Sequence, residues 1–212
     1  MKTLLKVVLL SSGLCLAGLA QASEVLEGAM KSLAKNSKAF AQAKTATEAN
    51  TALTEMQKAA ATAKQNKPDS LVKQPKDSVK VKQYEQKFDA LTQEIVVDFY
   101  EGVFSKHQVQ TYSDRYIGTQ YIQHNPYVAD GKAPFVNYFT QYFKEHPDAK
   151  NTIKRVVAEG DLVVLHVHST QNAQDGGEAV VDIFRVEQGK IVEHWDVVQS
   201  IPAESANRNT MF

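Results

Sequence analysis

Apolar residues in the first part of the chain recur at alternating spacings of about four and three. The three sets are Leu26, Met30, Leu33, Ser37 and Phe40; Ala49, Leu53, Met56, Ala60 and Ala63; and Tyr84, Phe88, Leu91 and Ile95. Each set forms one stripe along a helix. The stripes are narrow and rich in alanine, and residues 66–75, with two prolines, indicate a loop before the third helix. The pattern therefore predicts an Ala-rich segment of about three helices.

The second part of the chain changes from helical to strand periodicity. Residues 96–104 continue the third helix, residues 112–122 are predicted to be helical, and residues 134–143 carry another aromatic helical stripe. Four segments rich in Val and Ile then have a period of two, at residues 151–159, 161–170, 179–187 and 190–199. Asp175-Gly176-Gly177 and Gln188-Gly189 are the hairpin turns between them. This order predicts an α+β fold with helices on one face of a curved antiparallel sheet.

Alternation along these strands places titratable groups among large apolar side chains. Asp182 lies between Val180 and Phe184 on one face, and His194 and Asp196 lie between Val192 and Val198. A carboxylate in apolar surroundings must be paired, hydrogen-bonded or shifted in pKa, which suits proton transfer. The alternative is a solvated sheet face on which both aspartates are ordinary surface residues.

Four residues of metal-ligand type occur in this region, namely His124, His166, Asp182 and His194. No local spacing, such as two histidines one helical turn apart, supports a metal centre. We therefore expect no metal. The net charge is zero, with 24 basic and 24 acidic residues, which argues against nucleic acid or an anionic membrane as the main partner.

The first residues have the pattern of a secretory signal peptide, residues 1–22. Lys2 and Lys6 precede an apolar run at residues 7–19 that is short for a membrane span, and Ala20-Gln21-Ala22 fits a cleavage site. An uncleaved anchor is the alternative. Cleavage would remove Cys15, the single cysteine, and leave a mature chain from Ser23. A cysteine-free exported chain without a stable membrane anchor fits the bacterial periplasm.

Several motifs in order along the second part resemble a SnoaL-like domain of the nuclear transport factor 2-like superfamily. They are Tyr121-Ile122-Gln123-His124-Asn125-Pro126, Asp130-Gly131, Glu159-Gly160-Asp161-Leu162, Val181-Asp182-Ile183-Phe184-Arg185 and Glu193-His194-Trp195-Asp196. The resemblance covers about residues 92–212. It implies a cone-shaped, cystatin-like α+β barrel around a pocket, and a homodimer that pairs through the sheets.

The polyketide cyclases among these proteins catalyse intramolecular aldol condensation without a cofactor. The resemblance implies that Asp196 is the general acid and base, and that Asn125 is the pocket asparagine. Asp182 stands where the cyclases have a histidine. Our candidate catalytic residues are Asp196, Asp182 and His166, and our candidate substrate-binding residues are His124, Asn125, His194 and Trp195.

Two functions follow for this domain. The first is acid/base chemistry on a small apolar ligand that contains a carbonyl group, of the aldol condensation, isomerisation or hydrolysis type. Asp196 would remove a proton next to the carbonyl, His166 or Asp182 would tune or share that proton, and Asn125 and His124 would bond the enolate oxygen. The second is a non-catalytic module that binds a small ligand in the same pocket.

The helical segment, residues 23–91, resembles the first three helices of cytochrome b562. The motifs are Leu26-Glu27-Gly28-Ala29-Met30, residues 52–61 and Phe88-Asp89-Ala90-Leu91. The resemblance implies that Met30 is an axial haem ligand, which would make haem binding and electron transfer a third function. The partner histidine belongs to a fourth helix, but no histidine occurs between Ser23 and Lys106. We therefore interpret Met30 as a core methionine and expect no cofactor.

Overall fold

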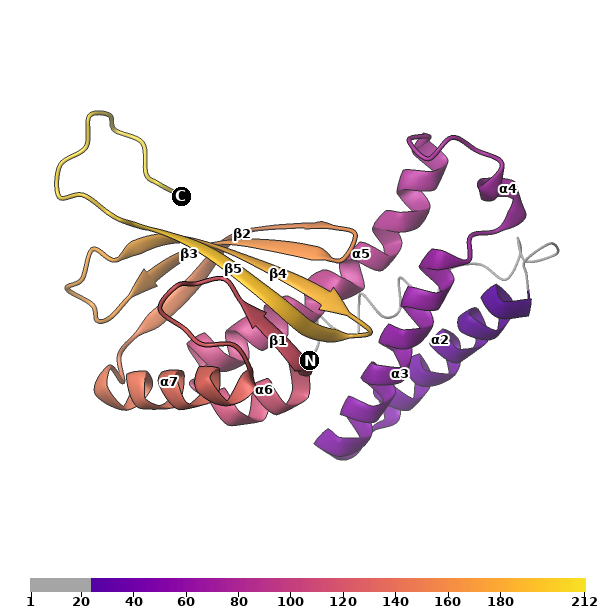
Figure 1. The fold of residues 1–212 in the computed structure, drawn as a ribbon, viewed down its shortest axis with the longest axis horizontal. Helices are drawn as coiled ribbons and strands as arrows, with labels where there is room; N and C mark the ends of the chain where they lie inside the picture. Colours follow the sequence, from indigo (N-terminus) through magenta and orange to yellow (C-terminus); the bar gives the residue numbers. More distant parts are fainter. Residues whose placement is uncertain (1–23) are drawn as a thin grey trace. The chain divides into compact units, whose positions relative to one another are not determined.

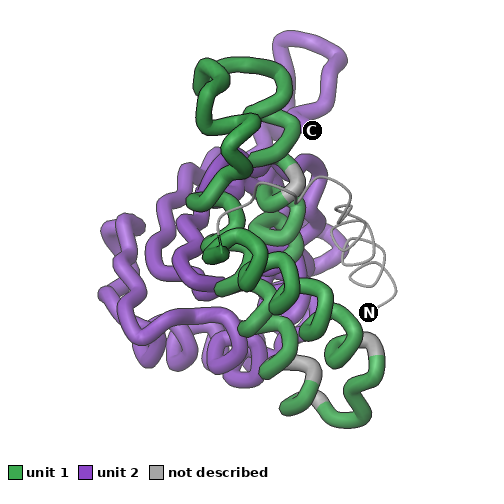
Figure 2. The backbone as a smooth tube through the Cα atoms, turned by 90° about the vertical axis from the view of Figure 1, so that its right-hand side faces the viewer, with its two compact units in different colours: residues 1–94 green, residues 95–212 purple. Residues whose placement is uncertain are grey.

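The computed structural model describes residues 24–212, so the predicted signal peptide, with Cys15, lies outside the described residues. The chain divides between Glu94 and Ile95 into two compact units, shown in green and purple in Figure 2. Within the described part, no helix combines the length and the apolar character needed to cross a membrane.

Unit 1 is helical. It contains α2 (Glu24–Gln42), α3 (Ala46–Gln65), the single turn α4 (Asp69–Val72) and the start of α5 (Val79–Tyr100). The predicted stripes supply most of its core, which includes Leu26, Leu33, Leu53, Met56 and Phe88. Tyr84 donates its hydroxyl hydrogen bond to the carbonyl of Ala63 over 2.8 Å, which joins α5 to α3.

Unit 2 is built on a five-stranded sheet. Its strands are β1 (Ile117–Gln123), β2 (Lys150–Glu159), β3 (Leu162–Thr170), β4 (Glu178–Glu187) and β5 (Lys190–Ser200), in the order β1-β5-β4-β3-β2. The pairs among β2, β3, β4 and β5 are antiparallel, as predicted. β1 pairs with β5 in parallel, so the sheet is mixed rather than wholly antiparallel.

The prediction of one helix over residues 112–122 was wrong. The helix α6 (Val109–Tyr116) ends at Tyr116, and the chain continues directly into β1. β1 has an irregular register against β5 and an exposed middle, so its side chains do not show a clean alternation. The strand is therefore stabilised by pairing with a distant segment rather than by its own pattern.

Helices cover one face of this sheet. α6 and α7 (Lys132–Glu145) lie below it in Figure 1, and the end of α5 continues into a π-helical turn, η2 (Glu101–Ser105). Phe99 at the end of α5 contacts Phe184 of β4, with ring centroids 6.0 Å apart. A Cβ atom at Gly102 would lie 2.0 Å from the ring of Tyr112, so the π-helical turn requires glycine there. Unit 2 is an α+β fold with its core between helices and sheet.

A polar cluster in an aromatic cavity

A cavity of about 320 Å³ lies within unit 2, between the sheet and the helices. Eight of the described residues that line it are Phe or Tyr, and a group of hydrogen-bonded polar side chains lines it too. This volume is at the lower end of the range for small-molecule sites. The combination of aromatic walls and a few convergent polar groups is typical of such sites.

Asp182 and Asp196 lie side by side in this cavity. They are directly opposite each other on β4 and β5, so both side chains project from the same face of the sheet. Asp182 is 6% exposed and Asp196 is partly buried. Two neighbouring carboxylates with little access to water require hydrogen-bond donors or a shared proton.

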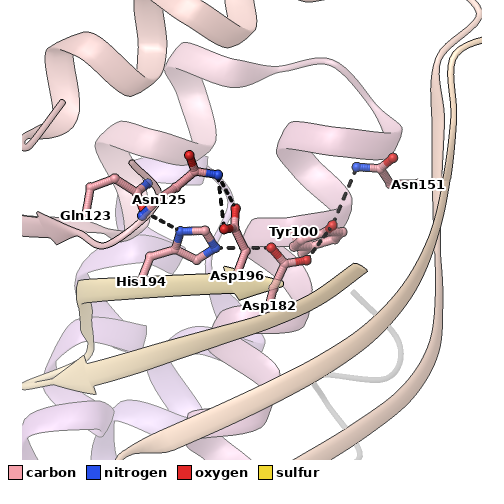
Figure 3. A network of polar contacts seen from close by, with 7 residues as sticks. All are labelled: Tyr100, Gln123, Asn125, Asn151, Asp182, His194 and Asp196. Atoms are coloured by element: carbon pink, nitrogen blue, oxygen red, sulfur yellow. Dashed lines mark hydrogen bonds and ion pairs between the residues drawn. The ribbon is translucent and has the colours of Figure 1, made fainter. Parts of the chain in front are cut away.

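Two side chains form hydrogen bonds with Asp182 (Figure 3). The hydroxyl of Tyr100, at the end of α5, donates to Asp182 Oδ2 over 2.9 Å, and His194 Nε2 lies 3.1 Å from Asp182 Oδ1. Burial, followed by the negative charge of Asp182, raises the pKa of Tyr100 well above its ordinary value. Tyr100 therefore remains a protonated hydrogen-bond donor to this carboxylate.

The orientation of Gln123 decides which nitrogen of His194 carries a proton. Gln123 Oε1 accepts the backbone N–H of Asn125 over 3.0 Å, which identifies this atom as the oxygen of the amide. The same oxygen lies 2.9 Å from His194 Nδ1, so we infer that Nδ1 carries a hydrogen and donates it. A single further proton must then lie between His194 Nε2 and Asp182 Oδ1, because a bare lone pair would repel the carboxylate.

The orientation of Asn125 is decided in the same way. Its Oδ1 accepts the backbone N–H of Tyr127 over 2.9 Å, so its amide nitrogen faces Asp196. That nitrogen donates to Asp196 at 3.0 Å and 2.7 Å from the two carboxylate oxygens. Asp196 is thus an acceptor, while the His194–Asp182 pair holds the proton.

The loop after β1 places both amides. Asp130 accepts the backbone N–H of Gln123 over 2.7 Å, and the N–H of Gly131 bonds to the carbonyl of Tyr121 over 2.9 Å. Gly131 has φ of +98°, which favours glycine. The Asp130-Gly131 motif therefore folds the loop back on β1 and holds Gln123 and Asn125 toward β5.

Three of the seven candidate residues lie away from this cluster. His166 pairs with Val181 on the other face of the sheet, where its Nδ1 lies 3.1 Å from Arg155 and its ring 5.2 Å from that of Phe212. The expectation that His166 shares a proton with Asp196 is therefore wrong, because the sheet separates them.

His124 and Trp195 form a separate pair. Their rings stack with centroids 4.6 Å apart, and His124 Nε2 lies 2.9 Å from Glu193 Oε1. The bonds to His124 and then Arg185 lower the pKa of Glu193. Neither ring is among the residues that line the cavity. This position contradicts our expectation that His124 bonds an enolate oxygen there and that Trp195 binds the substrate.

The sequence reasoning missed three members of the cluster, namely Tyr100, Gln123 and Asn151. Asn151 Nδ2 lies 3.5 Å from the hydroxyl of Tyr100, a long contact at the edge of the network. Gln123 was detectable in principle, because it lies two residues before Asn125 within the motif that carries the resemblance. Tyr100 and Asn151 come from distant elements and carried no local signal.

The cluster also has the donor types of a metal site. Asp182, His194 and Asp196 each offer one ligand atom, and these atoms lie within 4.8 Å of one another. Carboxylate and imidazole suit several divalent metals. The hydrogen bonds described above account for the same atoms without a metal, and the expectation of a metal-free site stays a prediction.

Solved structures similar to this chain cover about half of it. TsrD from Streptomyces laurentii is 19% identical over 52% of this chain and 90% of its own, with a TM-score of 0.44. A putative polyketide cyclase from Acidithiobacillus ferrooxidans is 19% identical over 50% and 87%, with a TM-score of 0.43. A putative ketosteroid isomerase from Kribbella flavida is 14% identical over 57% and 87%, with a TM-score of 0.45. No curated protein sequence matches the chain.

The cytochrome b562 family model matches residues 25–97, about a third of the chain. The described residues of this segment do not fit a haem held by methionine and histidine. Met30 is only partly buried, beside the buried stripe of Leu26 and Leu33, which also corrects our interpretation of it as a core residue. Histidine is absent from the sequence of unit 1, so the second axial ligand is missing.

The second match covers more than half of the chain and contains the whole polar cluster. It is the family model of SnoaL-like polyketide cyclases, at residues 94–206. The five-stranded sheet, the helices on one face and the cavity between them all lie within unit 2. The chain therefore belongs to the SnoaL-like polyketide cyclase family.

Proposed function

We propose that unit 2 catalyses proton transfer next to the carbonyl group of a small, largely apolar ligand. The observation that carries the proposal is the division of roles between neighbouring groups in one cavity. Asp196 has only an acceptor function, and the His194–Asp182 pair holds one proton. A base and an acid within reach of the same ligand are what enolisation requires.

The residues divide the reaction into balanced steps. Asp196 takes the proton from the carbon next to the carbonyl, and the electron pair of that C–H bond forms the enolate. His194 Nε2 gives its proton to the enolate oxygen, while Asp182 compensates the charge of the imidazole. In an isomerisation, a second carbon takes the proton from Asp196 while the enol O–H returns its proton to His194, which restores the carbonyl. In an aldol condensation, the enol carbon attacks a second carbonyl of the same ligand, the new alkoxide takes the proton from Asp196, and the enol O–H returns its proton to His194.

In this scheme Asn125 orients the base instead of bonding the enolate. Its amide nitrogen is committed to both oxygens of Asp196. These bonds hold the carboxylate on the sheet face that lines the cavity.

Deuterium exchange into the methyl group of acetophenone in D2O, followed by proton NMR, tests the base without knowledge of the natural substrate. We expect the wild-type protein to accelerate the exchange and Asp196→Asn to reduce it by about 100-fold or more, the usual contribution of a positioned base. Asp148→Asn, the same change at an exposed position, should exchange like wild type.

Unchanged exchange in Asp196→Asn would remove Asp196 from this role.

The second candidate function, a non-catalytic binding module, is favoured by one feature. Both oxygens of Asp182 and both of Asp196 already have partners within the protein. Acetophenone that binds in the cavity without accelerated exchange would support this second function.

We further propose that the protein works in the periplasm after removal of residues 1–22. The support is the charged start, the short apolar run and the Ala20-Gln21-Ala22 site. The intact mass of the exported chain tests this proposal, because it must correspond to a first residue of Ser23.

A further inference from the structure

The charges that line the cavity are of one sign. Glu178, Asp182 and Asp196 contribute three carboxylates, and none of the described residues that line the cavity is a lysine or an arginine. The proton held by the His194–Asp182 pair neutralises Asp182 alone. The cavity thus retains the charges of Asp196 and Glu178, and no side chain of the described lining compensates them.

These two charges lie at different depths. Glu178 and Asp182 project from the same face of β4, and four residues of strand separate their Cα atoms by about 13 Å. Asp182 is buried beside Asp196, whereas Glu178 is exposed and receives only a long hydrogen bond, 3.4 Å, from Ser200. Asp182 therefore lies in the buried part of the cavity, and we call the exposed edge at Glu178 its mouth.

Two aromatic rings of α7 accompany Glu178 at the mouth. Tyr138 and Tyr142 line the cavity and stack with centroids 6.3 Å apart and ring planes 13° apart. Burial raises the pKa of Tyr142, and the neighbouring Tyr138, Glu178 and Asp175 raise it further. A negative field thus reaches this ring, whose face is itself attractive to cations.

We propose that the cavity accepts a substrate with a positively charged nitrogen, which lies at the mouth between Tyr142 and Glu178 while the carbonyl end reaches Asp196 and His194. A carboxylate or phosphate at the mouth would meet a like charge, with no basic side chain of the described lining to balance it. The position of the carbonyl end depends on the proposed function. The selection for a cation depends only on the charges and rings of the mouth.

Three ligands that share one ring and one acetyl group isolate the effect of charge. They are 4-acetylbenzylammonium, 4-acetylbenzamide and 4-acetylbenzoate, which are cationic, neutral and anionic at pH 7. We expect titration calorimetry on the full chain at low salt to show the ammonium ligand binding about tenfold or more tightly than the benzoate. The affinity of 4-acetylbenzamide should lie between those of the other two ligands. Added salt should narrow the difference in affinity between the ammonium ligand and the benzoate.

Substitution at the mouth assigns the preference to a residue. Glu178→Gln should lower the affinity for 4-acetylbenzylammonium by about threefold or more and leave the affinity for 4-acetylbenzamide unchanged. Glu187→Gln is the matched control, because it removes the same charge from the far end of β4, where Glu187 pairs with Arg185 outside the cavity lining. It should leave all three affinities unchanged.

Three results would overturn the inference: a benzoate that binds as tightly as the ammonium ligand, no binding of the ammonium ligand at millimolar concentration, or an ammonium affinity unchanged by Glu178→Gln. If acetophenone exchange fails but the charge ranking holds, the cavity is a binding site for organic cations. If exchange succeeds and the ranking reverses, the proposed function stands and this inference alone is wrong.

Discussion

At the scale of single residues, two hydrogen bonds to the backbone decide where the protons of the cluster lie. Gln123 and Asn125 each place their amide oxygen on a main-chain N–H, of Asn125 and Tyr127 respectively. Main-chain donors cannot exchange roles, so each amide presents a known atom to the cavity. The amide oxygen of Gln123 accepts a hydrogen bond from His194, and the amide nitrogen of Asn125 donates one to Asp196.

The tautomer of His194 follows from this arrangement. We expect nitrogen-15 NMR of the imidazoles to show a protonated Nδ1 on His194, and Asp182→Asn to leave a neutral ring that still has Nδ1–H. His107 is an internal contrast, because its Nε2 lies 3.0 Å from the carbonyl of Ala149 and must carry the hydrogen. A neutral His194 protonated only on Nε2 would contradict the assignment.

The alternation of side chains predicted part of this cluster and could not predict the rest. The alternation along each strand was enough to predict which residues share a face with Asp182 and which share one with Asp196. The register of β4 against β5 then places the two aspartates opposite each other. His166 was misplaced because a period of two does not say which face of β3 turns to the helices. Gln123 reaches the cluster because β1 pairs in parallel with β5, and Tyr100 reaches it from the end of α5. Both are long-range contacts that leave no local pattern in the sequence.

At the scale of elements, the four hairpin strands were predictable and β1 was not. β2, β3, β4 and β5 begin and end within a residue of the predicted segments, because each combines β-branched residues with turn residues at its ends. β1 follows α6 without a break, and its first residue, Ile117, pairs with Ile191 of β5. Only the partner strand makes this segment extended.

Helix α3 begins at a capping box that we expect to stabilise unit 1. Thr45 Oγ1 accepts the N–H of Glu48, and Glu48 Oε2 accepts that of Thr45, both over 3.2 Å. Thr45→Ala should lower the free energy of opening of the first turn of α3 by about 1 kcal/mol, measured by amide hydrogen exchange. Thr47→Ala, two residues later, should cause no loss, and equal losses in both variants would show that the cap contributes nothing.

The same cap should depend on pH. Hydrogen bonds from the backbone of Lys44 and then of Thr45 lower the pKa of Glu48. A carboxyl group whose pKa is lowered by folding adds stability above its unfolded pKa, and this stability is lost as the pH falls through the folded value. Protection of the first turn should therefore decline below about pH 4, and Glu48→Gln should remove this decline.

At the scale of the whole molecule, two kinds of unit share one chain. Unit 2 contains all six histidines, the cavity and the polar cluster, whereas unit 1 buries Ala-rich stripes and two methionines sit on its helices, Met30 and Met56. Composition predicted this division, since aromatic residues and histidine become frequent only after about residue 95. The assembly of the chain, including a homodimer through the sheets, stays a prediction.

Haem addition tests whether the cytochrome-like unit retains the function of the family it resembles. Methionine and histidine ligation requires a histidine, and unit 1 has none in its sequence. The nearest in sequence, His107, is already committed within unit 2, where its ring stacks on Phe143 at 3.9 Å and bonds to Ala149. We therefore expect haemin titration to give no saturable one-to-one Soret band, and Met30→Leu to behave like wild type. A stoichiometric band that Met30→Leu abolishes would show that Met30 ligates haem, and that the missing ligand comes from outside unit 1.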